Sequence, residues 1–282
     1  MAKKKKTQRT TKQALAVAKD TKKNVGDRIQ SLTEVSGEIC TKKSVFDAII
    51  DVLTDVDEEF AVREEALVSL QSASFSVVDF EQHHSAYIAA LRKVSKGTDQ
   101  ALCEQALEIL AAQKDGQTQR SLLKGLKDPK KAKIAPERAL QLLGYDAHSD
   151  AYDVAKELVK NPPSDVVKRE ALRLLSSDST AAKIFSKLLR DKKESFEIRQ
   201  LCASALHSLE PKTLYKYAKQ IVVDKADSDE LRATCLSALT HFGDELTDKD
   251  SKLLEQVKGL KEKASSKLKK RARAFLDRFG DN

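Results

Sequence analysis

Residues 62–70 read Val-Arg-Glu-Glu-Ala-Leu-Val-Ser-Leu, and relatives of this phrase recur along the whole chain. The shared pattern is an apolar or small residue, three variable positions, Ala or Cys, a residue that is usually Leu, two further positions, and Leu. Residues spaced in this way lie on one face of an α-helix, so the phrase predicts an amphipathic helix. Its relatives begin at Leu102, Ala135, Val167, Ile198, Leu231 and Leu268.

The Ala or Cys at the centre of each phrase sets the length of the repeat. A small side chain lets a neighbouring helix approach closely, as packing of ridges into grooves requires. The seven small residues are Ala66, Ala106, Ala139, Ala171, Cys202, Cys235 and Ala272, at spacings of 40, 33, 32, 31, 33 and 37 residues. One helix pair cannot bury its apolar face alone, so a repeat of this length indicates pairs that stack into a continuous core.

A second helical pattern precedes each of these anchor helices, and Pro, Gly, Ser and Asp separate the helices as turn residues. The preceding patterns cover residues 45–53, 84–94, 120–126, 151–159, 181–189, 214–223 and 253–260. We therefore expect an all-α solenoid of about seven helix pairs over residues 44–282. We also expect a disordered basic arm at residues 1–14 and a capping helix within residues 15–43.

Three of the anchor helices carry a family resemblance. FAVREEALVSL, FEIRQLCASAL and DELRATCLSAL resemble the second helix of a HEAT repeat of the short, phycobilisome-lyase-like type. The resemblance extends over roughly residues 44–279 and implies a right-handed superhelix, but no function. Leu102-Cys103 and Ala135-Pro136 depart from the pattern, so the repeat is irregular there.

The recurring arginines Arg63, Arg199 and Arg232 stand at the start of their anchor helices. We interpret them as a structural hydrogen-bond ladder between repeats, because they recur with the repeat and not with a site. The alternative is that they line a concave face and bind phosphate or carboxylate.

The charge of the chain is distributed unevenly. Residues 1–30 carry ten basic and two acidic side chains, residues 31–112 carry six and fifteen, and residues 257–282 carry nine and three. The basic ends are candidate contacts for nucleic acid, in the arm and in the last predicted helix. The candidate residues are Lys3, Lys4, Lys5, Lys6 and Arg9, together with Lys267, Lys269, Lys270, Arg271 and Arg273.

No catalytic or metal-binding constellation stands out in the sequence. The four Cys are scattered without a CxxC motif, which is typical of reduced thiols in a cytoplasmic protein. The deoxyhypusine hydroxylases are enzymes built on HEAT repeats, but this sequence lacks the His-Glu pairs that their iron needs. We therefore expect no enzyme, no cofactor, and no membrane span or secretory signal.

The function that these observations favour is a protein-binding scaffold or adaptor, whose acidic first half could receive a basic partner. The alternative is a sequence-nonspecific nucleic-acid-binding protein that uses the two basic ends. A lesser alternative, which rests on the family resemblance, is a bilin-lyase-like subunit or chaperone. The sequence leaves the identity of the partner and the oligomeric state open.

Overall fold

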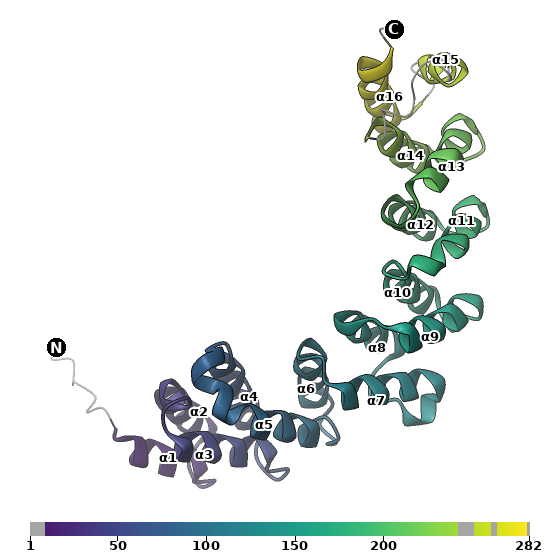
Figure 1. Cartoon of the computed structure of the whole chain (residues 1–282). Coiled ribbons are helices and arrows are strands. Elements are labelled where there is room, and N and C mark those ends of the chain that lie inside the picture. Colours follow the sequence, from purple (N-terminus) through teal and green to yellow (C-terminus); the bar gives the residue numbers. More distant parts are fainter. Residues whose placement is uncertain (1–8, 242–250, 261–263, 281–282) are drawn as a thin grey trace, which may run out of the picture. The chain divides into compact units, whose positions relative to one another are not determined.

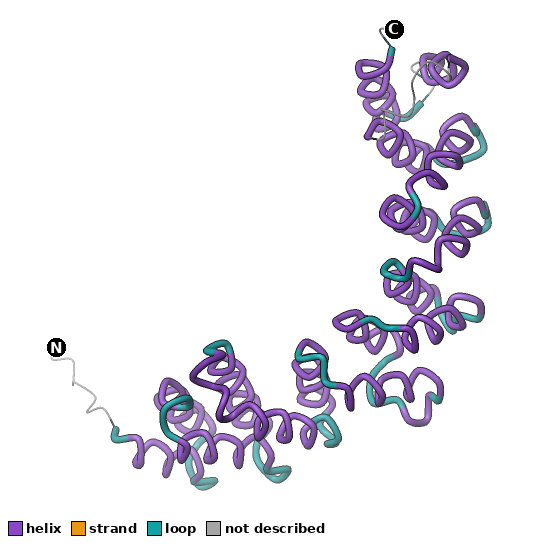
Figure 2. The backbone as a smooth tube through the Cα atoms, in the orientation of Figure 1, coloured by secondary structure: helices purple, strands orange, loops and turns teal. Residues whose placement is uncertain are grey.

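The computed structural model describes residues 9–241, 251–260 and 264–280, and these residues form helices joined by turns and loops without any strand (Figure 2). The chain divides into two compact units, Met1–Asp146 and Ala147–Asn282. Each unit is a stack of helix pairs (Figure 1). The all-helical repeat fold expected from the sequence is therefore confirmed.

The first unit contains four helix pairs, which follow one another along the chain. They are α1 (Thr11–Lys19) with α2 (Val25–Val35), α3 (Lys43–Thr54) with α4 (Phe60–Ser74), α5 (Val77–Val94) with α6 (Gln100–Ala112), and α7 (Gly116–Lys127) with α8 (Pro136–Leu143).

The second unit also contains four pairs within its described residues. They are α9 (Ser149–Lys160) with α10 (Asp165–Leu175), α11 (Ala182–Arg190) with α12 (Phe196–Leu209), α13 (Pro211–Val223) with α14 (Asp229–His241), and α15 (Ser251–Gly259) with α16 (Ser266–Phe279).

The pairs stack in two layers inside each unit. First helices contact the first helices of neighbouring pairs, as in α1–α3–α5 and α11–α13–α15. Second helices contact second helices, as in α2–α4, α6–α8 and α10–α12–α14–α16. Each helix thus buries one stripe against its own partner and another against the next pair, which explains why no pair needs to be stable alone.

The predicted small anchors lie in these inter-helix contacts. All seven are at most 4% exposed, and each sits in the second helix of its pair. The Leu that closes each phrase is buried beside it, for example Leu70 at 0% and Leu206 at 0% exposure. The repeat register derived from the sequence is therefore confirmed by the structure.

The N-terminal region differs from the expectation. Helix α1 begins at Thr11, inside the segment 1–14 that was expected to lack structure. Together with α2 it forms a helix pair over residues 11–35, where one capping helix within residues 15–43 was expected. This additional pair carries the same signature, with Arg28 at the ladder position and Ser31 at the anchor position, both buried. This pair does not match the repeat pattern of Ala or Cys anchors, because its anchor is Ser, which is small but polar.

None of the described helices combines the length and the apolar character that crossing a membrane requires.

Candidate binding surfaces

Four buried arginines occupy one register in four helix pairs. Each stands near the start of the second helix, and its Nε donates a hydrogen bond to the carbonyl of the penultimate residue of the first helix. Arg28, Arg63, Arg199 and Arg232 donate to Ala18, Leu53, Leu189 and Val222 at 2.9, 3.2, 2.8 and 3.0 Å, respectively. Each bond satisfies a carbonyl that has no partner within its own helix. The predicted residues Arg63, Arg199 and Arg232 thus hold their own pair together.

A carboxylate of the following pair completes this ladder. Arg28 pairs with Glu58, and Arg199 pairs with Asp227, with both guanidinium ends engaged in each case. Lys168 takes the same position in α10 and donates to Glu194 at 2.6 Å. Each carboxylate lies five residues before the ladder position of its own pair, so the link joins one repeat to the next. These acidic partners were not predicted from the sequence, because their five-residue spacing from the ladder position becomes informative only when the arginine contacts are known.

The ladder is interrupted in the third and fourth pairs. The ladder position is Cys103 in α6 and Pro136 in α8, and neither can supply a guanidinium. The Cys103 thiol donates to the carbonyl of Ser95 at 3.0 Å. This bond takes the place of the backbone bond that an arginine would make, but a thiol does not replace the arginine's ion pair with the next repeat. These are the two positions at which the sequence departs from the repeat pattern.

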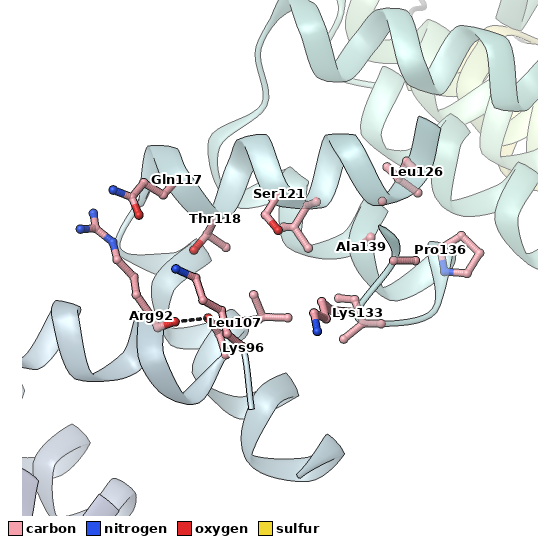
Figure 3. A pocket seen from close by; sticks show the side chains of 15 residues that line it. Arg92, Lys96, Leu107, Gln117, Thr118, Ser121, Leu126, Lys133, Pro136 and Ala139 are labelled. Carbon is pink, nitrogen blue, oxygen red and sulfur yellow. Dashed lines mark hydrogen bonds between the residues drawn. The ribbon is translucent and has the colours of Figure 1, made fainter. Parts of the chain in front are cut away.

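A cavity of about 80 Å³ lies at this interruption, within the first unit (Figure 3). Its walls come from the end of α5, from one face of α7 and from the loop that leads into α8. Leu107, Leu122, Leu126 and Ile134 give the cavity apolar walls, and Arg92, Lys96 and Lys133 border it with basic groups. No carboxylate is among its lining residues.

Arg92 is the one basic group of this cavity that is tied to a described carboxylate. Its Nε donates to Oδ1 of Asp115 at 3.1 Å, and the Thr118 amide donates to the other carboxylate oxygen at 2.8 Å. Burial raises the pKa of Asp115, but the hydrogen bonds from Arg92 and Thr118 outweigh burial and hold the pKa below its ordinary value. Lys96 and Lys133 are exposed and form no ion pair with a carboxylate in the described part of the chain.

A basic and aromatic surface covers two neighbouring first helices of the second unit, α11 and α13. We call it the α11–α13 face. The two helices carry six basic residues and no acidic residue: Lys183, Lys187, Arg190, Lys212, Lys216 and Lys219. The Arg190 guanidinium lies 4.6 Å from the ring centre of Tyr217, and Lys219 Nζ lies 3.9 Å from that of Tyr215. These residues were not predicted from the sequence, because they belong to two different repeats and interrupt no pattern.

An exposed apolar corner lies at the junction of α4 and α5 in the first unit. Phe75, Val77 and Val78 are 77%, 71% and 88% exposed, which is unusual for three large apolar residues so close together. A cavity of about 140 Å³ adjoins this corner, and Val77, Phe80 and Tyr87 help to line it. This corner also escaped the sequence analysis, because its residues read as a continuation of amphipathic helices.

The predicted basic contacts are spread over separate places. Lys3, Lys4, Lys5 and Lys6 lie outside the described residues. Arg9 contacts α2, where its Nη1 donates to the Ser31 hydroxyl at 2.7 Å. The remaining five are all exposed on α16, whose opposite face packs on α14: Lys267, Lys269, Lys270, Arg271 and Arg273.

The cysteines behave as core residues. Cys202 and Cys235 are fully buried at anchor positions, and burial raises the pKa of each thiol to about 12. A thiol with such a pKa is protonated at neutral pH and is a poor nucleophile. Over the described residues, no group of three or more His, Cys, Asp and Glu side chains is arranged to hold a metal ion.

Comparison with known proteins supports the fold and leaves the family undetermined. No protein-family model matches the sequence, and no curated protein matches it either. Among solved structures, the chain is similar to the complex of CpcE and CpcF of phycocyanin lyase from Nostoc sp. PCC7120. The identity is 16%, the match covers 92% of this chain and 98% of that chain, and the TM-score is 0.39.

The chain is also similar to human deoxyhypusine hydroxylase, solved in complex with glycerol. Here the identity is 13%, the match covers 88% of this chain and 99% of that chain, and the TM-score is 0.36. Both likenesses concern the helical repeat fold alone. The prediction that the chain is not an enzyme is corrected on this point, because both of these structures carry the names of enzymes, a lyase and a hydroxylase.

Proposed function

We propose that this chain is a protein-binding scaffold whose main contact is the apolar corner at Phe75, Val77 and Val78. The observation that carries the proposal is the exposure of these three side chains together. Soluble proteins rarely leave a contiguous apolar patch open to water, and such patches commonly mark sites of association.

The chemistry around the corner indicates the kind of partner. Asp79 and Glu81 follow it directly, and residues 31–112 have an excess of nine acidic side chains. Tyr87 helps to line the adjoining cavity, and its buried hydroxyl has no hydrogen-bond partner in the described structure. We therefore assign the corner to a peptide segment with an apolar anchor flanked by Lys or Arg, which supplies both apolar contact and charge complementarity.

A selection from a phage-displayed library of random peptides tests this assignment. The full chain is immobilised, and the enriched peptides are synthesised and titrated by fluorescence polarisation. We expect enriched sequences that place one large apolar residue beside basic residues. Phe75→Ser should weaken their binding about tenfold or more, or about 1.4 kcal/mol.

Val166→Ser is the matched control, because Val166 is exposed but lies in the second unit on α10. It should leave binding unchanged. Peptides that bind equally well to the Phe75→Ser variant, or a selection that enriches no sequence, would rule out the apolar corner as the contact.

The α11–α13 face supports a second candidate function, the binding of single-stranded nucleic acid. Six basic side chains supply phosphate contacts, and Tyr215 and Tyr217 offer rings on which bases can stack. This face combines basic groups with two tyrosine rings, whereas the cation–ring contact described on α16 is that of Arg278 with Phe279. It therefore replaces the basic ends of the chain as the favoured place for this activity.

Fluorescence anisotropy with a labelled single-stranded oligonucleotide at low and high salt separates the two places. Lys187→Glu with Lys216→Glu should abolish most of the binding and flatten its salt dependence, because each neutralised phosphate contributes to that slope. Tyr217→Ala should cost about 1–3 kcal/mol by loss of stacking. The control pair Lys267→Glu and Lys270→Glu on α16 should have a smaller effect, and a larger effect would return the activity to the C-terminal helix.

A further inference from the structure

We propose that the cavity at the ladder interruption binds a small organic anion with a short apolar chain. This site is independent of the apolar corner and of the α11–α13 face. The proposal rests on three properties of the cavity: its origin in the repeat, the division of its lining into apolar and basic parts, and the absence of a carboxylate that would neutralise the basic part.

The origin of the cavity follows from the repeat register. In intact pairs, a long ladder side chain extends from the start of the second helix toward the segment that precedes the next second helix, as Arg199 does toward Asp227. In the third pair this position is Cys103, whose side chain ends at its bond to Ser95. In the fourth pair, Lys131 stands five residues before the ladder position, where several other pairs have an acidic residue. The link between the third and fourth pairs therefore lacks both the guanidinium and the carboxylate. The space lies directly beside this segment, against Ala132, Lys133 and Ile134.

A glycine in α7 allows the segment 132–134, which forms one wall of the cavity, to lie close to this helix. A Cβ atom added at Gly125 would lie 3.0 Å from the Cα atom of Ala132, closer than side chains ordinarily pack. Gly125 therefore permits the segment to pass tightly over the end of α7. Both Gly125 and Ala132 line the cavity, so this close approach closes the cavity on that side.

The lining has two chemically distinct parts. Leu107, Leu122 and Ile134 are 4%, 4% and 6% exposed and present apolar surface to the cavity. Lys96 follows α5 and Lys133 precedes α8, so two basic groups from different segments border the same space (Figure 3). A pocket with apolar walls and a few polar groups at its mouth is the usual form of a small-molecule site.

The charge of the pocket selects the sign of the ligand. Asp115 already neutralises Arg92, and the Thr118 hydroxyl donates a hydrogen bond to the same carboxylate at 2.9 Å. Lys96 and Lys133 are therefore the groups that remain to attract a ligand, and together they favour an anion. The Ser121 hydroxyl also borders the cavity and is a further donor for the anionic head.

The size of the cavity limits the apolar part of the ligand. An apolar cavity of about 150 Å³ holds benzene. The cavity here, at about 80 Å³, is smaller. We therefore assign the interior to a short aliphatic chain and the mouth to a carboxylate or phosphate head, where Lys96 and Lys133 stand.

The probes for this proposal share a short chain and differ in their heads: butanoate, butyl phosphate, butan-1-ol and butylamine. Each is titrated into the full isotope-labelled chain, and binding is followed by amide chemical shifts in α7 and in residues 132–136. We expect saturable shifts with one or both anions, weaker shifts with the alcohol and none with the amine. The comparison of the two anions tells whether carboxylate or phosphate is the preferred head.

Two sets of variants test the assigned groups. Lys96→Gln with Lys133→Gln should weaken binding of the anion about tenfold or more and bring it to the level of butan-1-ol. The matched control is Lys93→Gln with Lys124→Gln, which removes two exposed lysines from α5 and α7 that do not line the cavity; it should leave binding unchanged. Ser121→Phe should compete with the ligand for space and weaken all of the probes that bind.

Several results would overturn the proposal. The first is an absence of saturable shifts with both anions at millimolar concentration. The second is equal binding of the alcohol and the anions by the unaltered chain. The third is equal loss of binding in the control and in the Lys96 and Lys133 variants, which would show that general positive charge, and not these two groups, attracts the anion.

Discussion

At the scale of single residues, the ladder arginines show why one side chain recurs at one place in the repeat. Arg199 donates through Nε to Leu189 and through its two other nitrogens to Asp227, so one planar group joins two helices of one pair and the next pair as well. Lysine has a single nitrogen and cannot make both kinds of bond in a fixed geometry. Lys168 accordingly keeps only the link to Glu194.

We predict that Arg199→Met will lower the free energy of unfolding by about 3–5 kcal/mol, because it leaves the carboxylate of Asp227 buried without its partner. Arg199→Lys should lie between this variant and the unaltered chain. Urea unfolding followed by circular dichroism measures both. Lys187→Met, an exposed change on α11, should stay within about 0.5 kcal/mol and serves as the control.

A double variant separates the cost of the unpaired charge from the value of the pair. Arg199→Met with Asp227→Leu should recover most of the lost stability, because replacing a whole buried ion pair by apolar side chains is often neutral. If the double variant is as unstable as Arg199→Met alone, the backbone bond to Leu189 is the main contribution and the ion pair is secondary.

At the scale of elements, the sequence predicted the helices well because their apolar period is strong and their anchors are small. All seven anchors lie in second helices, and all seven preceding segments fall in first helices. The N-terminal pair was not predicted because its anchor, Ser31, is as small as Ala or Cys but is polar. Prediction therefore failed where polarity was taken as a sign of exposure.

The candidate sites could not be predicted in the same way. The cavity lies in the two pairs whose ladder positions are Cys103 and Pro136, and the sequence showed only that these positions were irregular. The α11–α13 face joins residues of two helices that are distant in the chain, so it becomes visible only when α11 and α13 are seen to be neighbours. Its function depends on spatial proximity, which a periodic pattern does not report.

Helix α7 depends on one carboxylate for both its start and its attachment. Asp115 caps the helix through the Thr118 amide and pairs with Arg92 of α5. We predict that Asp115→Asn will cost about 1–2 kcal/mol at neutral pH, because Asn still caps the helix but loses the charged pair. Asp99→Asn is the control, since Asp99 caps α6 without an arginine partner and should lose little.

The pH dependence of this difference gives a second test. The pKa of Asp115 is lower in the folded chain than its ordinary value of about 3.9, so the folded state favours the ionised form. The stabilisation is fully present above the unfolded pKa and is lost as the pH falls through the folded pKa. Urea unfolding at a series of acidic pH values should therefore show the unaltered chain and Asp115→Asn converging on acidification. A constant difference down to the lowest pH would mean that Asp115 acts through geometry and not through charge.

At the scale of the whole molecule, the chain has two compact units, and each unit is a stack of helix pairs. Each pair is stabilised by its neighbours in the stack, and such chains have a stability that is roughly a sum over pairs and the interfaces between adjacent pairs. The candidate surfaces follow the same division, with the apolar corner and the cavity in the first unit and the α11–α13 face in the second. A change in one unit is thus expected to leave the sites of the other intact.

Hydrogen exchange of the full chain, read by segment, tests this independence. We predict that Arg199→Met will accelerate exchange in α11, α12 and α14 by roughly a hundredfold, since a local loss of about 3 kcal/mol corresponds to that factor. The same variant should leave exchange in α2 and α4 unchanged, and Arg28→Met should produce the opposite pattern, because Arg28 makes the equivalent links to Ala18 and Glu58 in the first unit. Equal acceleration in both units by either variant would mean that the two units unfold as one cooperative block. In that case, a partner bound at the apolar corner could stabilise the α11–α13 face through unfolding alone, and the two candidate surfaces would have to be studied as one coupled system.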